Sequence, residues 1–412
     1  MPGLTFSFNK NVCPYCGNNP VPHFVFWYDE SLNILFTPLR QRLLYNPLTK
    51  FLKNRRLDQK IWHAVLFFLK FLGVIKIQDD PAKSKVRRAQ VLWEEAGRRD
   101  IQMQELLFFG KAIDVYSAQY TVDSKKKEIV FSGLPRPLGY INHRLDLMDD
   151  KAWLKKLFEQ NYLPVPKGAA VSGFAEALKI FQKIQEPKSS IRPVIVKPRT
   201  GSRGRHSTTF VFTQEDLKKA FKVAKQLCYW VIVEEQLFGP VYRATVINFE
   251  LCGVLRGDPP QIVGDGTHSI RELVFLKNQL PHKGVKDIKI DLDVEMFLFR
   301  QKLNLTSVLN KDQIVNLSEK IGVNYGGSSS EDFEACHPDN KELFEKAAKV
   351  LGDPIVGFDF IIQDITKTWK EQKCGFIEAN SLPFINLHHD PLYGQSRNVA
   401  AKVWDLIERK YV

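Results

Sequence analysis

The sequence IVGFDFII spans residues 355–362, and GFIEAN follows at residues 375–380. Both runs predict buried β-strands joined by a polar loop, because they are rich in β-branched and aromatic residues. Asp359 interrupts the first run, where an unpaired charge would be costly. Glu378 and Asn380 are two residues apart and therefore share one face of their strand. If the strands are neighbours, we expect a hard-oxygen site suited to Mg²⁺ in preference to a solvated strand end.

A second polar stretch follows another expected strand, residues 193–197. It begins with the lysine that ends this strand and runs KPRTGSRGRHST over residues 197–208. Its two glycines would let backbone N–H groups approach phosphate oxygens, and its cationic side chains would offset their charge. It is not a P-loop, because Gly-x-x-x-x-Gly-Lys-Ser/Thr occurs nowhere in the chain. A basic surface turn would look similar, so this loop alone leaves phosphate binding open.

Helices and strands alternate from Asp149 onward, which predicts an α/β (α+β) fold. The expected helices are residues 151–160 and 213–226, and the expected strands include residues 230–234, 243–249 and 251–255. EEQL, residues 234–237, ends one of these strands and could offer its backbone and a carboxylate to an adenine ring. By itself this segment is nonspecific.

The part of the chain before residue 149 carries no nucleotide motif. Residues 1–80 are aromatic-rich and basic, and their sequence predicts no particular fold. From about residue 85 to 145 we expect a small α/β unit with a helix at residues 87–99, strands at residues 115–122 and 128–131, and a closing linker at residues 133–137.

The composition is that of a soluble globular protein, with 44% of the 412 residues apolar and 25% charged. The net charge of +13 suits an anionic partner without identifying it. No zinc-finger spacing or aromatic-plus-basic RNA motif occurs, so no nucleic-acid partner is expected. Residues 1–10 have no secretory pattern, and we expect a cytoplasmic protein.

The most apolar segment is residues 61–77, which His63 and Lys70 interrupt. It is shorter than the ~20 residues that cross a bilayer, so we expect a buried helix, with an interfacial membrane helix as the alternative. A basic run before it keeps membrane-surface contact open: Arg40, Arg42, Lys50, Lys53, Arg55, Arg56 and Lys60. More often such a run is a solvated face.

Six cysteines are present, and four of them stand alone, as expected for reduced thiols in a cytoplasm. Cys13 and Cys16 form one Cys-x-x-Cys, with His23 nearby. A tetrahedral zinc site needs four ligands, and no second Cys-x-x-Cys supplies the others. We therefore expect an ordinary turn with two thiols in preference to a zinc half-site.

Further motifs lie in the C-terminal two thirds: VGDGTHSIREL at residues 263–273, GG at 326–327, HP at 337–338, EANSLP at 378–383 and RNVA at 397–400. In this order they resemble the ATP-grasp superfamily, most closely the ATP-grasp part of cyanophycin synthetase and bifunctional glutathione synthetase. The resemblance covers roughly residues 149–405. It implies an ATP-grasp fold, residues 146–412, in which two α/β subdomains clamp ATP, after an N-terminal mixed domain, residues 1–145.

The resemblance also implies roles for individual residues. Lys155 and Lys197 resemble phosphate-contacting lysines; Gly201, Ser202, Gly204 and Ser207 resemble the lid over the γ-phosphate; Glu234, Glu235 and Leu237 resemble the adenine hinge; Asp359, Glu378 and Asn380 resemble the metal ligands; Arg243 and Arg256 resemble arginines near the transferring phosphoryl group. The implied cofactors are ATP and Mg²⁺, with Mn²⁺ as an alternative metal.

A carboxylate–amine ligase is the activity that the resemblance implies. A carboxylate would take the γ-phosphoryl group of ATP, and an amine would attack the resulting acylphosphate. The partners would be small-molecule or peptide carboxylates and amines, and a homo-oligomer is left open. A phosphotransferase and a degenerate nucleotide-binding regulatory protein are the alternatives. Clustered buried charges argue against the degenerate protein, which has no physical reason to keep them.

Three departures from the family pattern bear on the substrate. Val241 stands where an acidic residue would contact the ribose, and Phe384 stands where a glycine is usual in the acceptor region. No P-loop follows for a second ATP-using ligase domain. These departures argue against cyanophycin synthesis as such and favour a different substrate. We expect residues 1–145 to shape substrate choice rather than ATP use.

Overall fold

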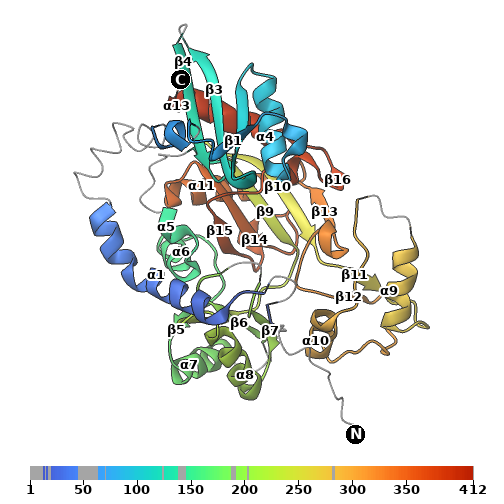
Figure 1. The fold of residues 1–412 in the computed structure, drawn as a ribbon. Coiled ribbons are helices and arrows are strands. Elements are labelled where there is room, and N and C mark those ends of the chain that lie inside the picture. Colours follow the sequence, from blue (N-terminus) through green and yellow to red (C-terminus); the bar gives the residue numbers. More distant parts are fainter. Residues whose placement is uncertain are drawn as a thin grey trace.

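The structure, a computed structural model, has a central six-stranded sheet and three smaller sheets around it (Figure 1). It describes residues 13, 15–16, 20–44, 64–69, 71–122, 125–137, 145–186, 192–201, 204–280 and 284–411. Helices and strands alternate through most of the chain, which confirms the mixed α/β class.

The central sheet has the order β15-β14-β9-β10-β13-β16, and its neighbours are antiparallel except β13 and β16. The strands are β9 (Val241–Ile247), β10 (Glu250–Asp258), β13 (Ser328–Glu331), β14 (Ile355–Ile361), β15 (Gly375–Asn380) and β16 (Tyr393–Gly394). Asp359 on β14 lies opposite Arg243 on β9 and Glu378 on β15. Residues directly opposite each other share a face of the sheet, so this register gathers the three side chains.

Helices α6 (Lys151–Gln160) and α11 (Pro338–Leu351) cover the opposite face of this sheet. Phe158 of α6 packs against Phe358 and Phe376, with ring centroids 6.0 and 4.9 Å apart. Because successive strand residues point to opposite faces, burial of Phe358 in this core turns Asp359 to the other side.

A second lobe lies below the central sheet in Figure 1 and has the strand order β5-β8-β6-β7. Its elements are β5 (Gly168–Val171), α7 (Phe174–Ile184), β6 (Val194–Pro198), β7 (Thr208–Val211), α8 (Gln214–Lys225) and β8 (Val231–Glu235). Helices α7 and α8 contribute to its apolar core. Thr213 caps α8, where its Oγ1 accepts the Asp216 N–H at 3.1 Å. The loop between β6 and β7, residues 199–207, contains the two glycines of the polar stretch, and we call it the glycine-bearing loop. Its ends are fixed by two neighbouring strands.

The N-terminal unit is an antiparallel sheet, β1-β2-β3-β4, with helix α4 against it. Its elements are β1 (Ile75–Gln78), η1 (Pro81–Lys83), α4 (Arg87–Gly97), β2 (Gln102–Phe108), β3 (Lys111–Val122) and β4 (Lys125–Ser132). Trp404 of the last helix, α13 (Val399–Tyr411), is fully buried in this core, and its Nε1 donates to the Leu92 carbonyl at 2.9 Å. The core therefore crosses the boundary expected at residue 145.

A third lobe is inserted between β10 and β13, and no expectation from the sequence separated it. It contains β11 (Gln261–Val263), α9 (Ile270–Gln279), α10 (Leu292–Arg300), β12 (Ile314–Asn316) and η2 (Val323–Tyr325) around its own core. The motif at residues 263–273 builds the start of α9. Ser269 and Glu272 form a reciprocal capping box there, which satisfies two free N–H groups. The remaining short elements are α5 (Leu145–Met148), η3 (Trp369–Glu371) and α12 (Asn386–His389).

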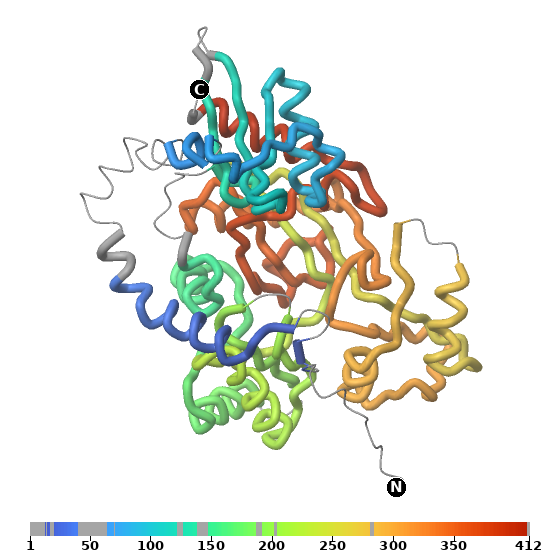
Figure 2. The backbone as a smooth tube through the Cα atoms, in the orientation of Figure 1, coloured from blue at the N-terminus to red at the C-terminus, as the bar shows by residue number. Residues whose placement is uncertain are grey.

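Helix α1 (His23–Leu44) crosses the second lobe, as the blue tube over the green lobe shows in Figure 2. Within this helix, Ser31 Oγ accepts the Tyr229 N–H at 3.1 Å. No helix among the described residues is long and apolar enough to cross a membrane. Of the basic run, Arg40 and Arg42 belong to α1, and the others lie outside the described residues.

The expectation of one buried helix at residues 61–77 is wrong. Residues 64–69 are helical, but β1 occupies residues 75–78 because it pairs with β2. Phe67, Phe68 and Phe71 are exposed by 75%, 58% and 80%, whereas Leu66 and Ile75 are buried in the core beneath β2 and β4 and Leu69 packs against it. The hydrophobicity of the segment alone does not show which of its side chains pack against the sheet β1-β2-β3-β4.

Candidate functional site

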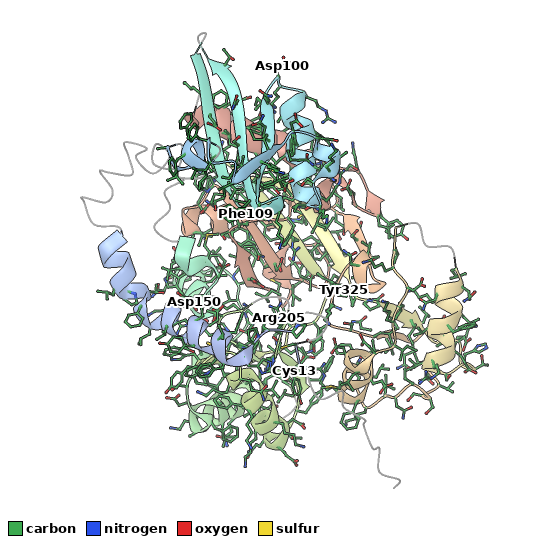
Figure 3. All side chains as sticks on the ribbon, viewed as in Figure 1. Cys13, Asp100, Phe109, Asp150, Arg205 and Tyr325 are labelled. Atoms are coloured by element: carbon green, nitrogen blue, oxygen red, sulfur yellow. The ribbon has the colours of Figure 1, made fainter. Side chains whose placement is uncertain are left out.

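A cavity of about 1600 Å³ opens where the central sheet, the second lobe and the inserted lobe meet. The central sheet lines it with Arg243, Asp359, Glu378 and Asn380. The second lobe contributes Lys197 and the loop after β6, and the inserted lobe contributes side chains of α10. Figure 3 labels Arg205 and Tyr325, two lining residues that come from the second and the inserted lobe.

Three oxygen-bearing side chains gather on the central sheet as the sequence predicted. Asp359 and Glu378 are partners in the β14–β15 ladder, and Asn380 lies two residues beyond Glu378. Arg243 donates through Nε and Nη2 to the two oxygens of Asp359, at 2.9 and 3.2 Å. The Asp359 charge raises the pKa of the Arg243 guanidinium. Two carboxylates and an amide oxygen facing one cavity fit a hard divalent cation such as Mg²⁺.

Lys155 and Lys197 converge on a single carboxylate. Their Nζ atoms lie 2.7 and 2.5 Å from Oε2 and Oε1 of Glu234, and all three side chains are less than one tenth exposed. Burial by itself would raise the pKa of Glu234, but the charges of Lys197 and Lys155 outweigh it and hold that pKa below its ordinary value. Two cations with one anion leave one excess positive charge, which favours an anionic ligand.

The residues expected to form the adenine hinge, Glu234, Glu235 and Leu237, lie at or just after the end of β8. Both of their carboxylates already have partners within the protein. The Glu234 carboxylate, expected beside adenine, binds the two lysines instead. Glu235 accepts the Lys167 N–H at 2.9 Å and lies 2.7 Å from Lys373 Nζ. Leu237 is 8% exposed. An adenine role for this segment stays a prediction.

The glycine-bearing loop borders the cavity with Gly201, Gly204 and Ser207, whereas Ser202 lies outside the described residues. Gly201 and Gly204 have φ angles of 105° and 64°, which favour glycine. Lys151 Nζ donates to the Gly201 carbonyl at 2.5 Å and lies 3.9 Å from Glu378 Oε1. Lys151 therefore links the loop to the carboxylate site. Nothing in the sequence distinguished it from other lysines of an amphipathic helix.

The structure does not bring Arg256 to the cavity. Arg256 is the ladder partner of Tyr242, whereas the neighbouring pair, Leu255 with Arg243, points to the opposite face. Its Nε donates to Asp258 at 2.9 Å. The resemblance implied that both arginines lie near the transferring phosphoryl group, but Arg243 lines the cavity and Arg256 does not, because they belong to alternate faces of one hairpin.

Two departures from the family pattern lie in the cavity wall. Val241 and Phe384 both line it. The Phe384 ring lies 5.8 Å from the Arg243 guanidinium and 5.2 Å from that of Arg88, which comes from helix α4. These distances allow cation–π attraction. The N-terminal unit thus reaches the wall through Arg88, a residue that the sequence gave no reason to select.

The fold and these motifs place the chain in the ATP-grasp superfamily of ligases. No family model matches the chain. It is 30% identical over 326 residues to a cyanophycin synthetase of Crocosphaera subtropica, an alignment that covers 77% of this chain and 36% of that protein. It is 31% identical over 269 residues to the glutathione biosynthesis bifunctional protein GshAB of Clostridium perfringens, covering 63% and 34%.

Among solved structures, the bifunctional glutathione synthetase of Pasteurella multocida matches with a TM-score of 0.52 and 26% identity. The match covers 78% of this chain and 43% of that one. The chain spans about a third of the length of the curated relatives that it matches.

Proposed function

We propose that this protein is an ADP-forming ligase that joins a carboxylate to an amine with ATP and Mg²⁺. The observation that carries the proposal is the shared face of Arg243, Asp359, Glu378 and Asn380 on one cavity, with Lys197 on the facing lobe. The relatives named above, a cyanophycin synthetase and a bifunctional glutathione biosynthesis protein, support this class of reaction.

In the proposed reaction, a substrate carboxylate attacks the γ-phosphorus of ATP and ADP leaves. An amine then attacks the acyl carbon, phosphate departs with the bonding pair, and the amine loses a proton. Asp359, Glu378 and Asn380 would hold Mg²⁺, which lowers repulsion between the phosphate oxygens and the incoming carboxylate. The chain's own contribution is to position and to neutralise charge.

The cationic side chains divide into two groups in this proposal. Lys197 of the second lobe and Lys155 of α6, which share the Glu234 carboxylate, would contact phosphates with their excess positive charge. Arg243 is held by Asp359 with a fixed guanidinium plane, so it can present its remaining N–H groups to the transferring group. Gly201, Gly204 and Ser207 would close over the phosphates, and the two glycines lower the cost of that movement.

The acceptor end would be shaped by Phe384. This side chain is 49% exposed and faces the cavity beside Arg243, where a glycine would leave more room. A bulky ring there narrows the space for substrate, and its face can contact a cationic or an apolar group. We infer an amino-acid or peptide substrate pair that differs from those of the relatives.

Val241 is the observation that favours a nucleotide-binding protein without ligase activity, because it puts an apolar side chain in the cavity wall. One assay distinguishes the candidates. The protein is incubated with Mg-ATP, a pool of amino acids and short peptides, and phosphate release is followed with and without amines blocked by acetylation. A ligase releases phosphate only with free amine and forms an amide product. A stable phosphorylated product would indicate a phosphotransferase, and no turnover with tight ATP binding would indicate a regulatory protein.

A further inference from the structure

Four potential metal ligands from distant parts of the chain meet beside the glycine-bearing loop. They are Cys13 and Cys16 of the segment that precedes α1, which we call the N-terminal arm, His23 at the start of α1, and His206 in the loop between β6 and β7. Their ligand atoms all lie within 4.8 Å of one another. Figure 3 marks the place with Cys13 and with Arg205, the neighbour of His206.

The separations are those of ligands around a tetrahedral metal ion. Cys16 Sγ lies 3.2 Å from His23 Nε2 and 3.4 Å from His206 Nε2, and Cys13 Sγ lies 3.5 Å from His206 Nε2. A tetrahedron with Zn–S bonds of about 2.3 Å and Zn–N bonds of about 2.05 Å has S···N edges of about 3.5 Å. The three measured edges therefore agree with a zinc geometry to within a few tenths of an ångström.

Hydrogen bonds among these groups do not account for the arrangement. The Nδ1 of His206 lies 2.8 Å from the Val223 carbonyl, which can only accept, so Nδ1 carries the proton. The Nε2 then has a single lone pair, and two thiol sulfurs approach it. Two thiols cannot both donate well to one lone pair, whereas one ion at the centre can bind every ligand atom. A backbone acceptor that fixes the remote nitrogen is also the usual support for a histidine that binds zinc.

Burial and backbone geometry add to this evidence. Cys16 and His206 are 5% and 1% exposed, and His206 has a φ of 53°, a left-handed conformation that is uncommon for residues other than glycine. The His206 N–H donates to the Tyr15 carbonyl at 3.0 Å, so the loop and the arm are joined by backbone as well. A Zn²⁺ ion with two thiolates is neutral, which allows the cluster to be buried without an unpaired charge.

We infer that Cys13, Cys16, His23 and His206 form a structural Zn²⁺ site that fastens the N-terminal arm to the glycine-bearing loop. Two sulfur and two nitrogen ligands select zinc over oxygen-preferring Mg²⁺ or Ca²⁺. Binding replaces the two thiol protons, so two protons are released for each ion bound. All four coordination positions are filled by protein, which excludes a catalytic zinc with an open position.

The site would bear on the loop that borders the cavity. His206 follows Arg205 directly, and both Cys16 and Arg205 line the cavity. Phe26 of α1 lies against Gly201, where a Cβ would come within 3.5 Å of its ring. The ion would thus hold the start of α1 and the loop as one unit. The N-terminal arm, expected to shape substrate choice, would then also restrain the loop expected to cover the phosphates.

The experiment measures metal in the full chain purified under reducing conditions without chelator. We expect about one zinc per chain by mass spectrometry and, by X-ray absorption at the zinc edge, two sulfur and two nitrogen ligands. His206→Ala should lower the bound zinc at least tenfold, whereas His206→Cys should retain it with three sulfur ligands. His268→Ala, at an exposed histidine paired with Asp265, is the matched control and should keep one zinc.

Further measurements keep the inference testable if His206→Ala fails to fold. Co²⁺ added to the chelator-treated parent should give the visible bands of tetrahedral cobalt with thiolate ligands, and Cys13→Ala should abolish them. Amide hydrogen exchange of α1 and residues 204–207 should rise after chelation, while that of β14 stays unchanged. The inference is overturned by a parent that binds neither zinc nor cobalt through sulfur, by a Cys13–Cys16 disulfide under reducing conditions, or by unchanged metal binding in His206→Ala. None of these readouts depends on ligase activity.

Discussion

Replacing Glu234 by Gln should destabilise the protein strongly, because this carboxylate is the shared partner of two buried lysines. Lys155 and Lys197 lie 2.7 and 2.5 Å from it, and none of the three side chains is more than 9% exposed. Glutamine keeps the shape but removes the charge, so two buried cations remain unpaired. Breaking a buried ion pair in this way costs about 3–5 kcal/mol.

Lys155→Met should lower the free energy of unfolding by at least about 1 kcal/mol less than Glu234→Gln does. It leaves Lys197 and Glu234 as a neutral pair, and replacing a buried charge by an apolar group of similar volume is often tolerated. The double variant should lose less free energy of unfolding than the sum of the two single losses, because removing Lys155 also removes one of the two cations that repel each other. Mg-ATP should stabilise Glu234→Gln more than the parent, since its phosphates supply the missing negative charge.

Urea unfolding followed by tryptophan fluorescence measures these differences, with Trp230 next to β8 in the same lobe. Glu215→Gln is the control, since its ion pair with Lys219 is exposed to solvent and contributes little to stability. The depressed pKa of Glu234 means that its contribution is complete above the unfolded value of about 4.3 and is lost as the pH falls through the folded pKa. The difference in free energy of unfolding between the parent and Glu234→Gln should therefore become smaller below about pH 4. Equal stability of Glu234→Gln and Glu215→Gln would refute the argument.

Three further predictions follow from single contacts. Glu378→Gln removes a charge from the proposed Mg²⁺ site and should lower kcat by about 10²–10³-fold with an unchanged thermal transition. Glu371→Gln, at an exposed carboxylate, should leave kcat unchanged, and parental turnover in Glu378→Gln would show that the metal assignment is wrong. Trp404→Ala empties a fully buried position and should cost about 3–5 kcal/mol, with faster hydrogen exchange in β2 and β3; if only α13 exchanged faster, the shared core would be disproved. Val241→Glu restores an acidic side chain to the cavity wall and should tighten ATP binding about tenfold by calorimetry, and an unchanged Kd would place the ribose elsewhere.

The sequence by itself determined the class of fold and several local elements, although not the strand β1 within residues 61–77 or the inserted lobe. The strand with Asp359 and the strand with Glu378 could be predicted because β-branched and aromatic residues cluster there, and α6 has the predicted bounds, Lys151–Gln160. The shared face of Glu378 and Asn380 could be predicted because a period of two assigns strand residues to faces without knowledge of the partner strand, whereas Asp359 joins them only through the pairing of β14 with β15.

Only the tertiary structure decided which distant residues meet. Arg256 does not face the cavity because the register of β9 with β10 pairs it with Tyr242, on the other face of the sheet from Arg243, and register is set by pairing between strands. Glu234 became the partner of two lysines because α6, β6 and β8 converge there. His206 lies 190 residues after Cys16, so no spacing rule could join them. Such contacts depend on how whole lobes pack, which local patterns of hydrophobicity and spacing do not encode.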